Sequence, residues 1–512
     1  MHRRTISIMS HFLGIDVGTS GTKAIVLDGT GAVLGTGSGG HEPDAPQPGW
    51  SEQDPEAWWP SSVSAIGAAC RNAGVEAASI DAVGVTGQMH GLVALDAAGV
   101  PVRPAILWND GRSQPQCRAV EERLGIEHLV AACGNRMLPG FTAPKLLWMR
   151  EHEPEAYARI ATVLLPKDWI RFRLSGEMVM DVSDASGTAV FDCARRTWSD
   201  DLLTELELPR SWWPHAAEGP EVVATISATA ASETGLRPGI PIVAGAGDQA
   251  ASAIGTGLVA EGRVGTTLGT SGVVFAPTDA WRSTPDGRLH AFCHAVPGRW
   301  HLMGVMLSGA GSLDWFRNAI VPDIDEQAGD DAFPRIEAMA NEVPAGADGL
   351  LFLPYLSGER TPWPDADARG AFIGLDLRHD RRHLARAVFE GVTHGLAQCL
   401  DLIRSTGVEP RTVTLSGGGA KSELWRRTCA DLFGTPVTTT STTEATACGA
   451  AILAAVGAGA FASVEDACAS VSKEKDRIEP GPDREVLMAR HEIFARLYPA
   501  LQSEFPAIAG NG

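Results

Sequence analysis

A four-residue segment, Gly-Thr-Ser-Gly, occurs twice in this chain, at residues 18–21 and 269–272, and this repeat constrains the fold more than any other feature. Each copy stands between two short apolar runs, in GIDVGTSGTK and in GTTLGTSGVV, and is therefore predicted to be the turn of a hairpin. The copies are 251 positions apart (269 − 18) in a chain of 512 residues. A repeat at half the chain length predicts a duplicated domain with one hydroxyl-rich turn in each half.

The first half is predicted to alternate strands and helices. After hairpin strands at 12–17 and 22–28, a strand–loop–strand unit spans 81–95, and a strand at 241–251 leads into a helix of small residues. Such an order is typical of an α/β domain.

The second half is predicted to repeat this plan. It opens with a hairpin at 262–276 and continues with helices within 308–345 and over 381–404. A strand at 411–420 ends in glycines, and a helix over 421–433 follows it. The fold class expected is therefore α/β, with two similar domains flanking a deep cleft.

These patterns predict three parts of the chain: a disordered or extended N-terminus over 1–11, a first domain over 12–256 and a second domain over 257–512. Within the second domain, the charged, proline-bearing segments 276–290 and 470–485 are predicted to be surface loops.

The charge balance argues against two classes of partner. Lysine and arginine number 42 against 62 aspartates and glutamates, which gives a net charge of −20. Nucleic acids and anionic lipids select basic surfaces, so we expect neither as a partner. The longest apolar runs also fall short of the roughly 20 residues that a membrane span needs.

Cysteine usage and the N-terminus favour a reducing cytoplasm. The nine cysteines are scattered without a CxxC pair, so neither a disulfide framework nor a zinc site is predicted. The leader MHRRTISIMS lacks an apolar core, and we interpret it as a disordered extension or an early start ahead of Met9 rather than a signal peptide.

The repeated turn has the composition of a phosphate-binding loop. Glycines let the backbone approach a ligand closely, and consecutive N–H groups in such a turn form an anion-binding concavity. In the first copy, Thr19, Ser20 and Thr22 add hydroxyls and Lys23 adds a cation, while Thr270 is the matching hydroxyl in the second. For one copy alone a plain hairpin turn is the commoner explanation, but two copies at matching places favour a shared polyphosphate.

Two further segments extend this hypothesis. Asp16 ends the strand before the first turn, where it could hold Mg²⁺ through water. The SGGGA segment at 416–420 joins a strand to a helix, so the helix N-terminus would face Gly418 and Gly419 and offer an anion or nucleotide site. A simple strand-to-helix connection is equally compatible with it, and it matches neither a Walker A nor a GxGxxG pattern.

Asp248 is the candidate general base. It stands among glycines and alanines in GAGDQAA, which leaves its carboxylate approachable. In phosphoryl transfer one carboxylate accepts the proton of the attacking hydroxyl. The alternative is that Asp248 is only the N-cap of the helix that follows.

Two loops are candidate sugar contacts. Met89 and His90 lie in GQMHG, where an imidazole could bind a hydroxyl and a thioether could pack on carbon. Trp108 and Asn109 lie in LWNDGR, which combines an apolar face with polar groups as sugar sites do. The alternatives are a loop histidine satisfied by the protein itself and, for the Asp and Arg of LWNDGR, a mutual ion pair.

With these segments in place, the chain from about residue 12 to 460 resembles the FGGY family of carbohydrate kinases. One family pattern resembles GFTAPKLLWMREH at 140–152, and a second resembles GAFIGLDLRHDRRHLARAVFE at 370–390, with His383 and Glu390 at the expected intervals. Several other stretches are similar to the branch of the family that phosphorylates D-xylulose: WSEQDPEAWW, GQMHG, AILWNDGRS, LLPKDW, FCHA, WHLM and LPYLSGERTP.

The resemblance implies two actin-like (ribonuclease H-like) domains that close over ATP, Mg²⁺ and a sugar. It makes Asp248 the general base, Asp16 the Mg-linked carboxylate, and Met89 and His90 sugar contacts. The two turns become phosphate clamps and SGGGA the adenosine site; by motif position, Gly309 and Ser422 join the ATP-binding set. It also implies a possible homodimer.

The function that the resemblance implies is ATP-dependent phosphorylation of D-xylulose at its terminal hydroxyl. A kinase for another ketose or polyol, such as ribulose, xylitol or a deoxy sugar, is the nearest alternative. A non-catalytic nucleotide-binding protein on the actin-like fold is a more distant one.

Overall fold

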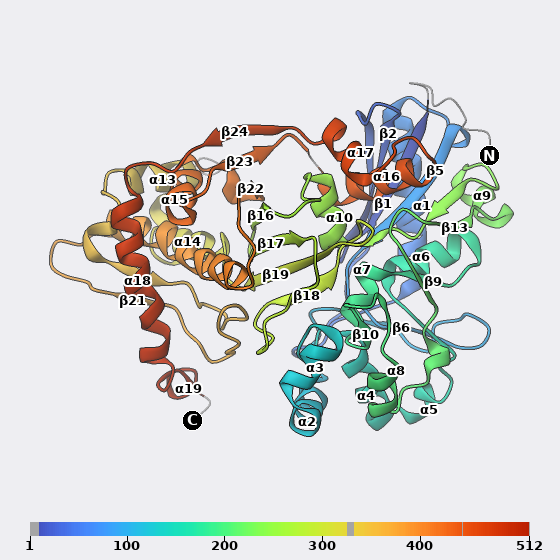
Figure 1. The fold of residues 1–512 in the computed structure, drawn as a ribbon, viewed down its shortest axis with the longest axis horizontal. Helices are drawn as coiled ribbons and strands as arrows, with labels where there is room; N and C mark the ends of the chain where they lie inside the picture. Colours follow the sequence, from blue (N-terminus) through green and yellow to red (C-terminus); the bar gives the residue numbers. More distant parts are fainter. Residues whose placement is uncertain (1–9, 325–331, 443, 511–512) are drawn as a thin grey trace.

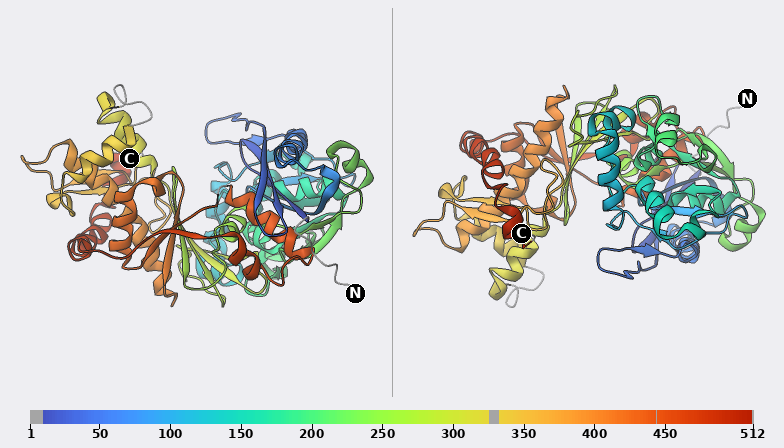
Figure 2. Two further views of the ribbon diagram at one scale, coloured as in Figure 1. Left: turned by 90° about the horizontal axis from the view of Figure 1, so that it is seen from above. Right: turned by 90° about the horizontal axis from the view of Figure 1, so that it is seen from below.

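The computed structural model describes residues 10–324, 332–442 and 444–510, which form two lobes, each built on a mixed seven-stranded sheet (Figure 1). The first half of the chain supplies one sheet and the second half the other, and the two lie side by side in all three views (Figures 1 and 2).

The first sheet has a meander at its centre. β1 (His11–Val17), β2 (Gly21–Asp28) and β3 (Val33–Gly40) are antiparallel, and β5 (Ile80–Gly87) lies parallel to β1 on its other side. The sheet continues through three further strands: β14 (Pro241–Val243), β13 (Val222–Thr225) and β15 (Ala246–Gly247).

The second sheet repeats this order. Strands β16 and β17 form the hairpin, β19 pairs with β17, and β22 lies parallel to β16 with β23 beyond it. The strands of this sheet are β16 (Arg263–Leu268), β17 (Gly272–Thr278), β18 (His290–Cys293), β19 (Trp300–Met306), β22 (Thr412–Ser416), β23 (Val437–Thr440) and β24 (Glu474–Ile478). In both sheets the hairpin has an antiparallel strand on one side (β3 beside β2, β19 beside β17) and two parallel strands on the other (β5 and β14 beside β1, β22 and β23 beside β16), which confirms the duplicated fold.

Helices pack on the first sheet with their backbones unusually close to the backbones of the strands. α1 (Trp58–Ala73) lies on β3, while α10 (Asp248–Gly255) packs on α16 (Ala445–Gly457), which in turn lies on β1 and β5. A Cβ added at Gly14 or Gly84 would stand 2.0 Å from a carbonyl oxygen of α16. Only glycine therefore permits this approach of helix to strand.

Although α16 belongs to the second half of the sequence, it lies against the first sheet (Figure 1). The expected division after residue 256 stays a prediction, and this helix ties the two lobes together across it.

The second lobe is built around α14 (Arg381–Ser405) and α15 (Glu423–Phe433). α14 is buried along most of its length and packs on β17, β19 and α15, so it is core rather than an exposed surface.

The remaining helices surround these layers: α2 (Gln114–Leu124), α3 (Ile126–Cys133), α4 (Thr142–His152), α5 (Pro154–Tyr157), α6 (Pro166–Ser175), α7 (Val182–Ala185), α8 (Asp200–Glu205), α9 (Ala228–Thr234), α11 (Gly311–Ala319), α13 (Ala332–Asn341), α17 (Val464–Val471), α18 (Arg484–Leu501) and α19 (Phe505–Ile508). Short strands complete the fold: β4 (Glu52–Gln53), β6 (Val93–Leu95), β7 (Ala105–Ile106), β8 (Thr162–Leu164), β9 (Val179–Asp181), β10 (Phe191–Asp192), β11 (Thr197–Trp198), β12 (His215–Ala217), β20 (Leu351–Leu353) and β21 (Ala371–Ile373).

Three local expectations need correction. Within 470–485 the chain forms edge strand β24, whose charged residues are exposed on both faces and so lack the alternation that marks a strand in sequence. The helix expected over 421–433 begins at Glu423, after a 3₁₀ turn. His11 already belongs to β1, while residues 1–9 of the expected N-terminal extension lie outside the described range.

The structure bears on two features of the chain, its cysteines and the apolar character of its helices. All nine cysteines are buried and free. Among the described helices, none is both long and apolar enough to cross a membrane.

Candidate active site

Asp16 and Asp248 come together because their strands run in parallel. Asp16 on β1 and Ala246 on β15 both align with Thr86 of β5, and Asp248 follows directly after Gly247. The carboxyl ends of three parallel strands thus carry both aspartates to one edge of the first sheet, where ligands bind in open α/β sheets. Both side chains are half-buried.

The two carboxylates share an electrostatic environment that disfavours charge. Burial and, to a smaller extent, the nearby Asp248 raise the pKa of Asp16 to about 7, against a lowering effect of Lys23. Burial also raises the pKa of Asp248 to about 6, while hydrogen bonds from Gln249 lower it. A carboxyl with a pKa near neutrality suits a general base, because it can both take and release a proton at physiological pH.

Asp248 is the first residue of α10 and not its N-cap. Gly247 occupies the N-cap position, with no side-chain cap. The N-cap alternative for Asp248 is therefore wrong: its carboxylate lies in the first turn of the helix but is not the N-cap.

The first GTSG turn is held by buried amides. The Gly18 N–H donates to the Gly21 carbonyl at 3.0 Å, which closes the turn. Gln53 Nε2 donates to the Thr19 carbonyl at 2.6 Å, and Thr19 Oγ1 donates to Gln88 Oε1 at 3.2 Å. The turn is thus fixed from behind, which leaves Ser20 exposed to solvent.

Lys23 and Thr22 have partners of their own. The Lys23 ammonium pairs with Glu444 Oε2 at 2.7 Å, with both side chains partly exposed. Thr22 is fully buried, and its hydroxyl lies 3.4 Å from Ser62 Oγ. Lys23 would have to leave Glu444 to bind a phosphate directly.

The sugar loop places Met89 and His90 beside the two aspartates. A Cβ on Gly247 would stand 2.8 Å from Met89 Cγ, so Met89 packs directly against the residue before Asp248. His90 has a positive φ of 69° and stacks on Phe141 with 4.6 Å between ring centroids. Burial lowers the pKa of His90 to about 3, which keeps the imidazole neutral.

The tautomer of His90 follows from its partner. Nδ1 lies 2.9 Å from the Gly187 carbonyl, which can only accept, so Nδ1 carries the proton and Nε2 is left as an acceptor. The loop is anchored by Lys145, whose buried ammonium donates to the His90 carbonyl at 2.9 Å. An acceptor at Nε2 suits a sugar hydroxyl.

Trp108 links the sugar loop to the first turn. Its indole N–H donates to Thr19 Oγ1 at 3.0 Å, while its ring is 42% exposed and free to cover a ligand. Asn109 beside it is exposed. Arg112 donates to both oxygens of Asp110, at 2.9 and 2.7 Å, so the expected alternative of an Asp–Arg pair is confirmed.

The second GTSG turn is braced by the segment after β19. The N–H groups of Gly309 and Gly311 both donate to the Thr270 carbonyl, at 2.8 and 3.2 Å. A Cβ at Gly309 would come within 2.5 Å of the Ser271 backbone, so this close approach requires glycine. Gly309 therefore shapes the turn through backbone contacts.

The SGGGA loop lies next to the second turn. Gly417 takes a φ of +81°, and a Cβ there would stand 2.6 Å from the Leu268 carbonyl. Nothing lies within 4 Å of the Cβ position of Gly418, whereas Gly419 is buried against Leu268. Ser422 is the N-cap of α15, and its hydroxyl accepts from the Trp425 N–H at 3.1 Å.

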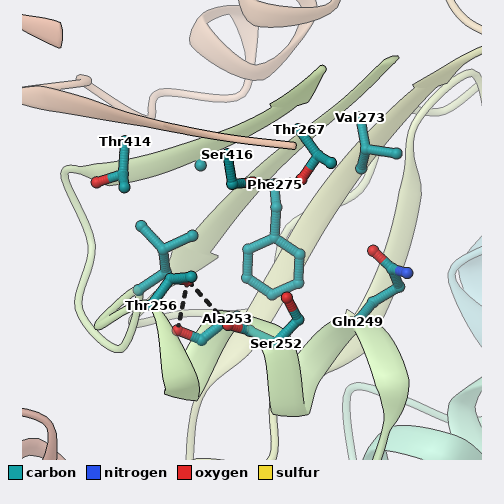
Figure 3. Close-up of a pocket in the computed structure, with 11 residues that line it drawn as sticks. Gln249, Ser252, Ala253, Thr256, Thr267, Val273, Phe275, Thr414 and Ser416 are labelled. Atoms are coloured by element: carbon teal, nitrogen blue, oxygen red, sulfur yellow. Dashed lines mark hydrogen bonds between the residues drawn. The ribbon is translucent and has the colours of Figure 1, made fainter. Parts of the chain in front are cut away.

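A narrow pocket joins the two lobes at this edge (Figure 3). From the first lobe, α10 contributes Gln249 and Ser252, which point upward in the view, and Thr256 follows the helix with its hydroxyl bonded back to the Ser252 and Ala253 carbonyls. From the second, Thr267 and Ser416 face them and are bonded to each other at 3.0 Å. One wall of the pocket includes Gln249, the residue after Asp248. The other wall includes Thr267, on the strand that leads into the second turn, and Ser416, the first residue of SGGGA.

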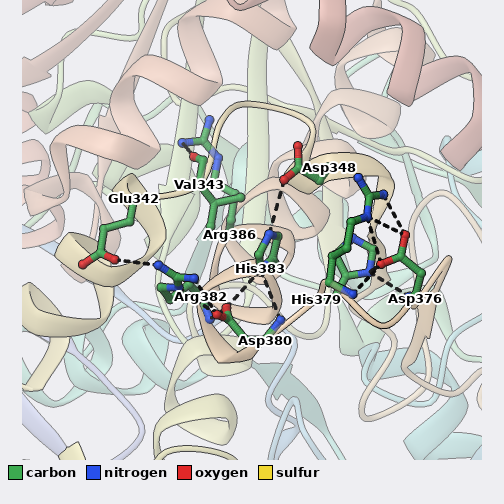
Figure 4. A network of polar contacts seen from close by, with 10 residues as sticks. Glu342, Val343, Asp348, Asp376, His379, Asp380, Arg382, His383 and Arg386 are labelled. Atoms are coloured by element: carbon green, nitrogen blue, oxygen red, sulfur yellow. Dashed lines mark hydrogen bonds and ion pairs between the residues drawn. The ribbon is translucent and has the colours of Figure 1, made fainter.

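The second family pattern has a structural role in the second lobe (Figure 4). His383 Nδ1 lies 3.0 Å from Asp380 Oδ1 at the start of α14, and its Nε2 lies 3.3 Å from Asp348. Glu390 is buried and pairs with Arg386 at 2.6 Å. These residues cap and anchor α14. The family pattern at 370–390 is therefore explained by a structural role, although it does not contain the two aspartates of the site.

Sequence reasoning missed the residues that support the site. Besides Gln53, Gln88 and Lys145, a buried charge cluster lies behind Asp248: Lys167 Nζ is bonded to Asp168 and lies 2.8 Å from Asp181 Oδ1. The cluster reaches the site through Ser183, whose hydroxyl accepts from the Gly247 N–H at 3.1 Å. The signals in the sequence were the stretches WSEQDPEAWW, GQMHG, GFTAPKLLWMREH and LLPKDW, which contain Gln53, Gln88, Lys145 and Lys167 and carry the family likeness without indicating these roles.

No cluster of three or more His, Cys, Asp or Glu side chains able to hold a metal ion occurs among the described residues. Any Mg²⁺ ligation by Asp16 would therefore have to be completed by water and nucleotide, as is usual for this ion.

Comparison with known proteins agrees with this geometry. The model of the FGGY family of carbohydrate kinases, N-terminal domain, matches residues 11–255, and the model of the C-terminal domain matches residues 264–458. A xylulose kinase from Escherichia coli (strain K12) is 42% identical over 96% of this chain and 99% of its own.

Solved structures show the same fold. The crystal structure of a xylulose kinase from Rhodospirillum rubrum superposes with a TM-score of 0.91 at 32% identity, over 97% of this chain and 99% of that one. A gluconate kinase from Lactobacillus acidophilus also superposes with a TM-score of 0.91, at 26% identity over 98% and 99% of the two chains.

Proposed function

Because the chain belongs to the FGGY family of carbohydrate kinases, we propose that it transfers the γ-phosphoryl group of ATP to the terminal hydroxyl of D-xylulose, with Asp248 as the general base. The observation that carries this proposal is the meeting of Asp16, Asp248 and the Met89–His90 loop at one sheet edge. The xylulose kinases among its relatives support the choice of sugar.

In the proposed reaction the terminal hydroxyl oxygen of the ketose attacks the γ-phosphorus. A bond forms between that oxygen and phosphorus, the bond to the β–γ bridging oxygen breaks, and ADP leaves with the bonding electrons. Asp248 takes the hydroxyl proton. Since burial raises its pKa to about 6, the ionised form prevails at neutral pH while the carboxylate remains basic enough to assist.

Each side of the cleft has a separate task. His90 Nε2 accepts from a sugar hydroxyl, Met89 and Trp108 pack on carbon, and Asn109 binds a further hydroxyl. Backbone N–H groups and hydroxyls of the two turns, at Thr19, Ser20 and Thr270, hold the phosphates, and Gly418 leaves room for adenosine. The donors are fixed before the ligand arrives, which lowers the reorganisation needed in the transition state.

The residues present fit a magnesium ion. Asp16 offers a hard carboxylate oxygen; burial and, second, the nearby Asp248 raise its pKa, and a cation bound here would favour its ionised form. When bound with the nucleotide, Mg²⁺ neutralises charge on the phosphates. Asp16 would hold it through water.

The nearest alternative is a different ketose or polyol. The likeness in fold to a gluconate kinase supports this alternative, and the loops at 86–91 and 107–112 are proposed to contact the hydroxyls that distinguish one sugar from another. A non-catalytic nucleotide-binding protein would not need a general base. The presence of Asp248 at this position therefore argues against that alternative.

A coupled ADP-release assay decides between these functions. Purified protein with MgATP is tested against D-xylulose, D-ribulose, xylitol, gluconate and no sugar. We expect the highest kcat/KM with D-xylulose, and phosphorus NMR of the product should show a terminal phosphate. Preference for another acceptor would contradict the sugar assignment, and absence of turnover with every acceptor would contradict the enzymatic function.

A further inference from the structure

Arg360 is a cation in the second lobe whose charge has no protein partner. It lies in the GERTP segment between β20 and β21, and its side chain is half-buried. Among the residues that the structure describes, its guanidinium makes neither a hydrogen bond nor an ion pair. A partly desolvated arginine without a partner is costly, so such a group points to an anion that arrives from outside the protein.

The backbone around Arg360 is fixed to the end of β19. Glu359 Oε1 accepts from the Leu307 N–H at 2.9 Å and from the Arg360 N–H at 2.7 Å. The Thr361 N–H donates to the Val305 carbonyl at 3.0 Å. The chain continues from β19 directly to Gly309, which braces the second GTSG turn. The segment that contains Arg360 and the second GTSG turn are therefore both hydrogen-bonded to residues at or just after the end of β19.

The side chain of Arg360 is close to the sugar loop of the other lobe. Burial lowers the pKa of both His90 and His290, and the positive charge of Arg360 is a further, smaller cause for each; the two imidazoles flank the ring of Phe141. His290 lies on β18, at the edge of the second sheet, and Phe292 of that strand packs in the core of the first lobe. Arg360 is thus near the proposed sugar contacts, and its backbone is fixed to the strand that leads to the proposed phosphate turn.

The neighbouring carboxyl of Glu359 only partly offsets the effect of burial, which lowers the pKa of Arg360, and the two side chains form no ion pair. Glu359 is 4% exposed, and burial raises its pKa to about 8, so it is mainly the neutral acid at pH 7. Its Oε2 also lacks a hydrogen-bond partner among the described residues.

We propose that Arg360 binds the phosphoryl group as it moves from ATP to the sugar, and then the phosphate of the product. The guanidinium offers paired N–H donors that match phosphate oxygens, and it is near the proposed sugar contacts while its backbone is fixed beside the segment that braces the second turn. This proposal rests on the proposed kinase function and adds a contact from the second lobe, whereas Asp248 belongs to the first.

The test compares the affinities of substrate and product. Arg360→Gln, Arg360→Lys and the wild type are titrated calorimetrically with D-xylulose and with D-xylulose 5-phosphate. We expect Arg360→Gln to weaken product binding roughly 10- to 100-fold, the range for loss of a charge-assisted hydrogen bond, and to change D-xylulose binding less than about threefold. Arg360→Lys should recover part of the product affinity, because it keeps the charge without the fork.

The matched control is Arg378→Gln, since Arg378 is an exposed arginine on the same lobe that pairs with Asp376. It should leave both affinities unchanged, and thermal unfolding should show every variant to be folded. Equal losses for sugar and sugar phosphate in Arg360→Gln would overturn the proposal in favour of a sugar-hydroxyl contact, and unchanged affinities would exclude any contact.

The two proposals fail in different ways. If the wild type phosphorylates another ketose instead of D-xylulose, the sugar assignment fails, and the same comparison with that ketose and its phosphate still decides the role of Arg360. A wild type that phosphorylates no sugar would overturn both.

Discussion

At the scale of single residues, the site depends on carboxyls whose charge is disfavoured until ligands arrive. Asp16 and Asp248 have pKa values raised to about 7 and about 6, mainly by burial. The proposed function needs these carboxyls in the ionised form, whereas burial makes that form unfavourable for folding. Such a conflict between activity and stability is common where charged groups serve catalysis.

The first prediction concerns Asp248. Replacing it by Asn removes the proton acceptor but keeps the shape, so we expect kcat to fall by about 10²–10⁴-fold while thermal unfolding shows a folded protein at least as stable as the wild type. In the wild type, kcat should decline on acidification through about pH 6, because protonated Asp248 cannot accept a proton. A variant with near-normal turnover would contradict the general-base role; initial rates across pH 5–8 provide the measurement.

The second prediction concerns stability. A raised folded-state pKa favours folding where the carboxyl is protonated, and this contribution is lost as pH rises from about 4 to about 7 for Asp16. Asp16→Asn stays neutral throughout, so it should stabilise the ligand-free protein at pH 8 by on the order of 1–2 kcal/mol, and by less at pH 5.

Urea unfolding at both pH values, without magnesium, measures this difference. Because the same variant should lose most of its kinase activity, a gain in stability together with a loss of turnover is expected. A stability gain that does not depend on pH would refute the electrostatic explanation.

At the scale of elements, glycines set how closely helices lie on the first sheet. The Cβ positions of Gly14 and Gly84 meet backbone oxygens of α16, which cannot move as a side-chain tip could. This packing holds the β1 and β5 ends, and with them Asp16 and the sugar loop.

The third prediction follows from that contact. Gly84→Ala should destabilise the protein by about 1–3 kcal/mol or more, because the added methyl would stand 2.0 Å from the Ala450 carbonyl oxygen. Gly40→Ala is the matched control, since Gly40 is also a strand glycine but has open space around its Cβ position. Equal unfolding midpoints for the two variants would show that α16 can shift without cost.

The fourth prediction concerns the SGGGA loop. Nothing lies within 4 Å of the Cβ position of Gly418, so Gly418→Ala should fold normally. If adenosine binds there, the methyl should raise KM for ATP several-fold while leaving KM for the sugar unchanged. The reverse pattern would place the nucleotide elsewhere.

At the scale of the whole molecule, the two sheets share one arrangement of core strands, and each carries a turn between its two hairpin strands and a loop after the strand that lies parallel to the first of them. In the first lobe that loop holds Met89 and His90; in the second it is SGGGA. Duplication thus supplied two equivalent positions, which the sequence has differentiated into a proposed sugar site and a proposed nucleotide site.

The fifth prediction is closure of the lobes. Water competes with the sugar as phosphoryl acceptor unless it is excluded, so ATP hydrolysis without sugar should be slow, and ATP should bind more tightly with it. Small-angle scattering should show a smaller radius of gyration with sugar and a non-hydrolysable ATP analogue together than with either alone. An unchanged radius would argue against a closing cleft.

The sequence by itself determined the duplication, the hairpin turns and the glycine-rich connections, because these depend on local backbone preferences that each segment carries alone. It also singled out Asp16 and Asp248 as candidates. It did not reveal β24, whose pairing with β23 rather than its own pattern makes it a strand.

Only the tertiary structure decided which distant residues support the site. Gln53 and Gln88 brace the first turn, Lys145 anchors His90, and α16 crosses from the second half onto the first sheet. Their roles arise from contacts between segments far apart in the chain. The raised pKa values of the two aspartates belong to the same class, since burial and mutual repulsion exist only once the strands have aligned.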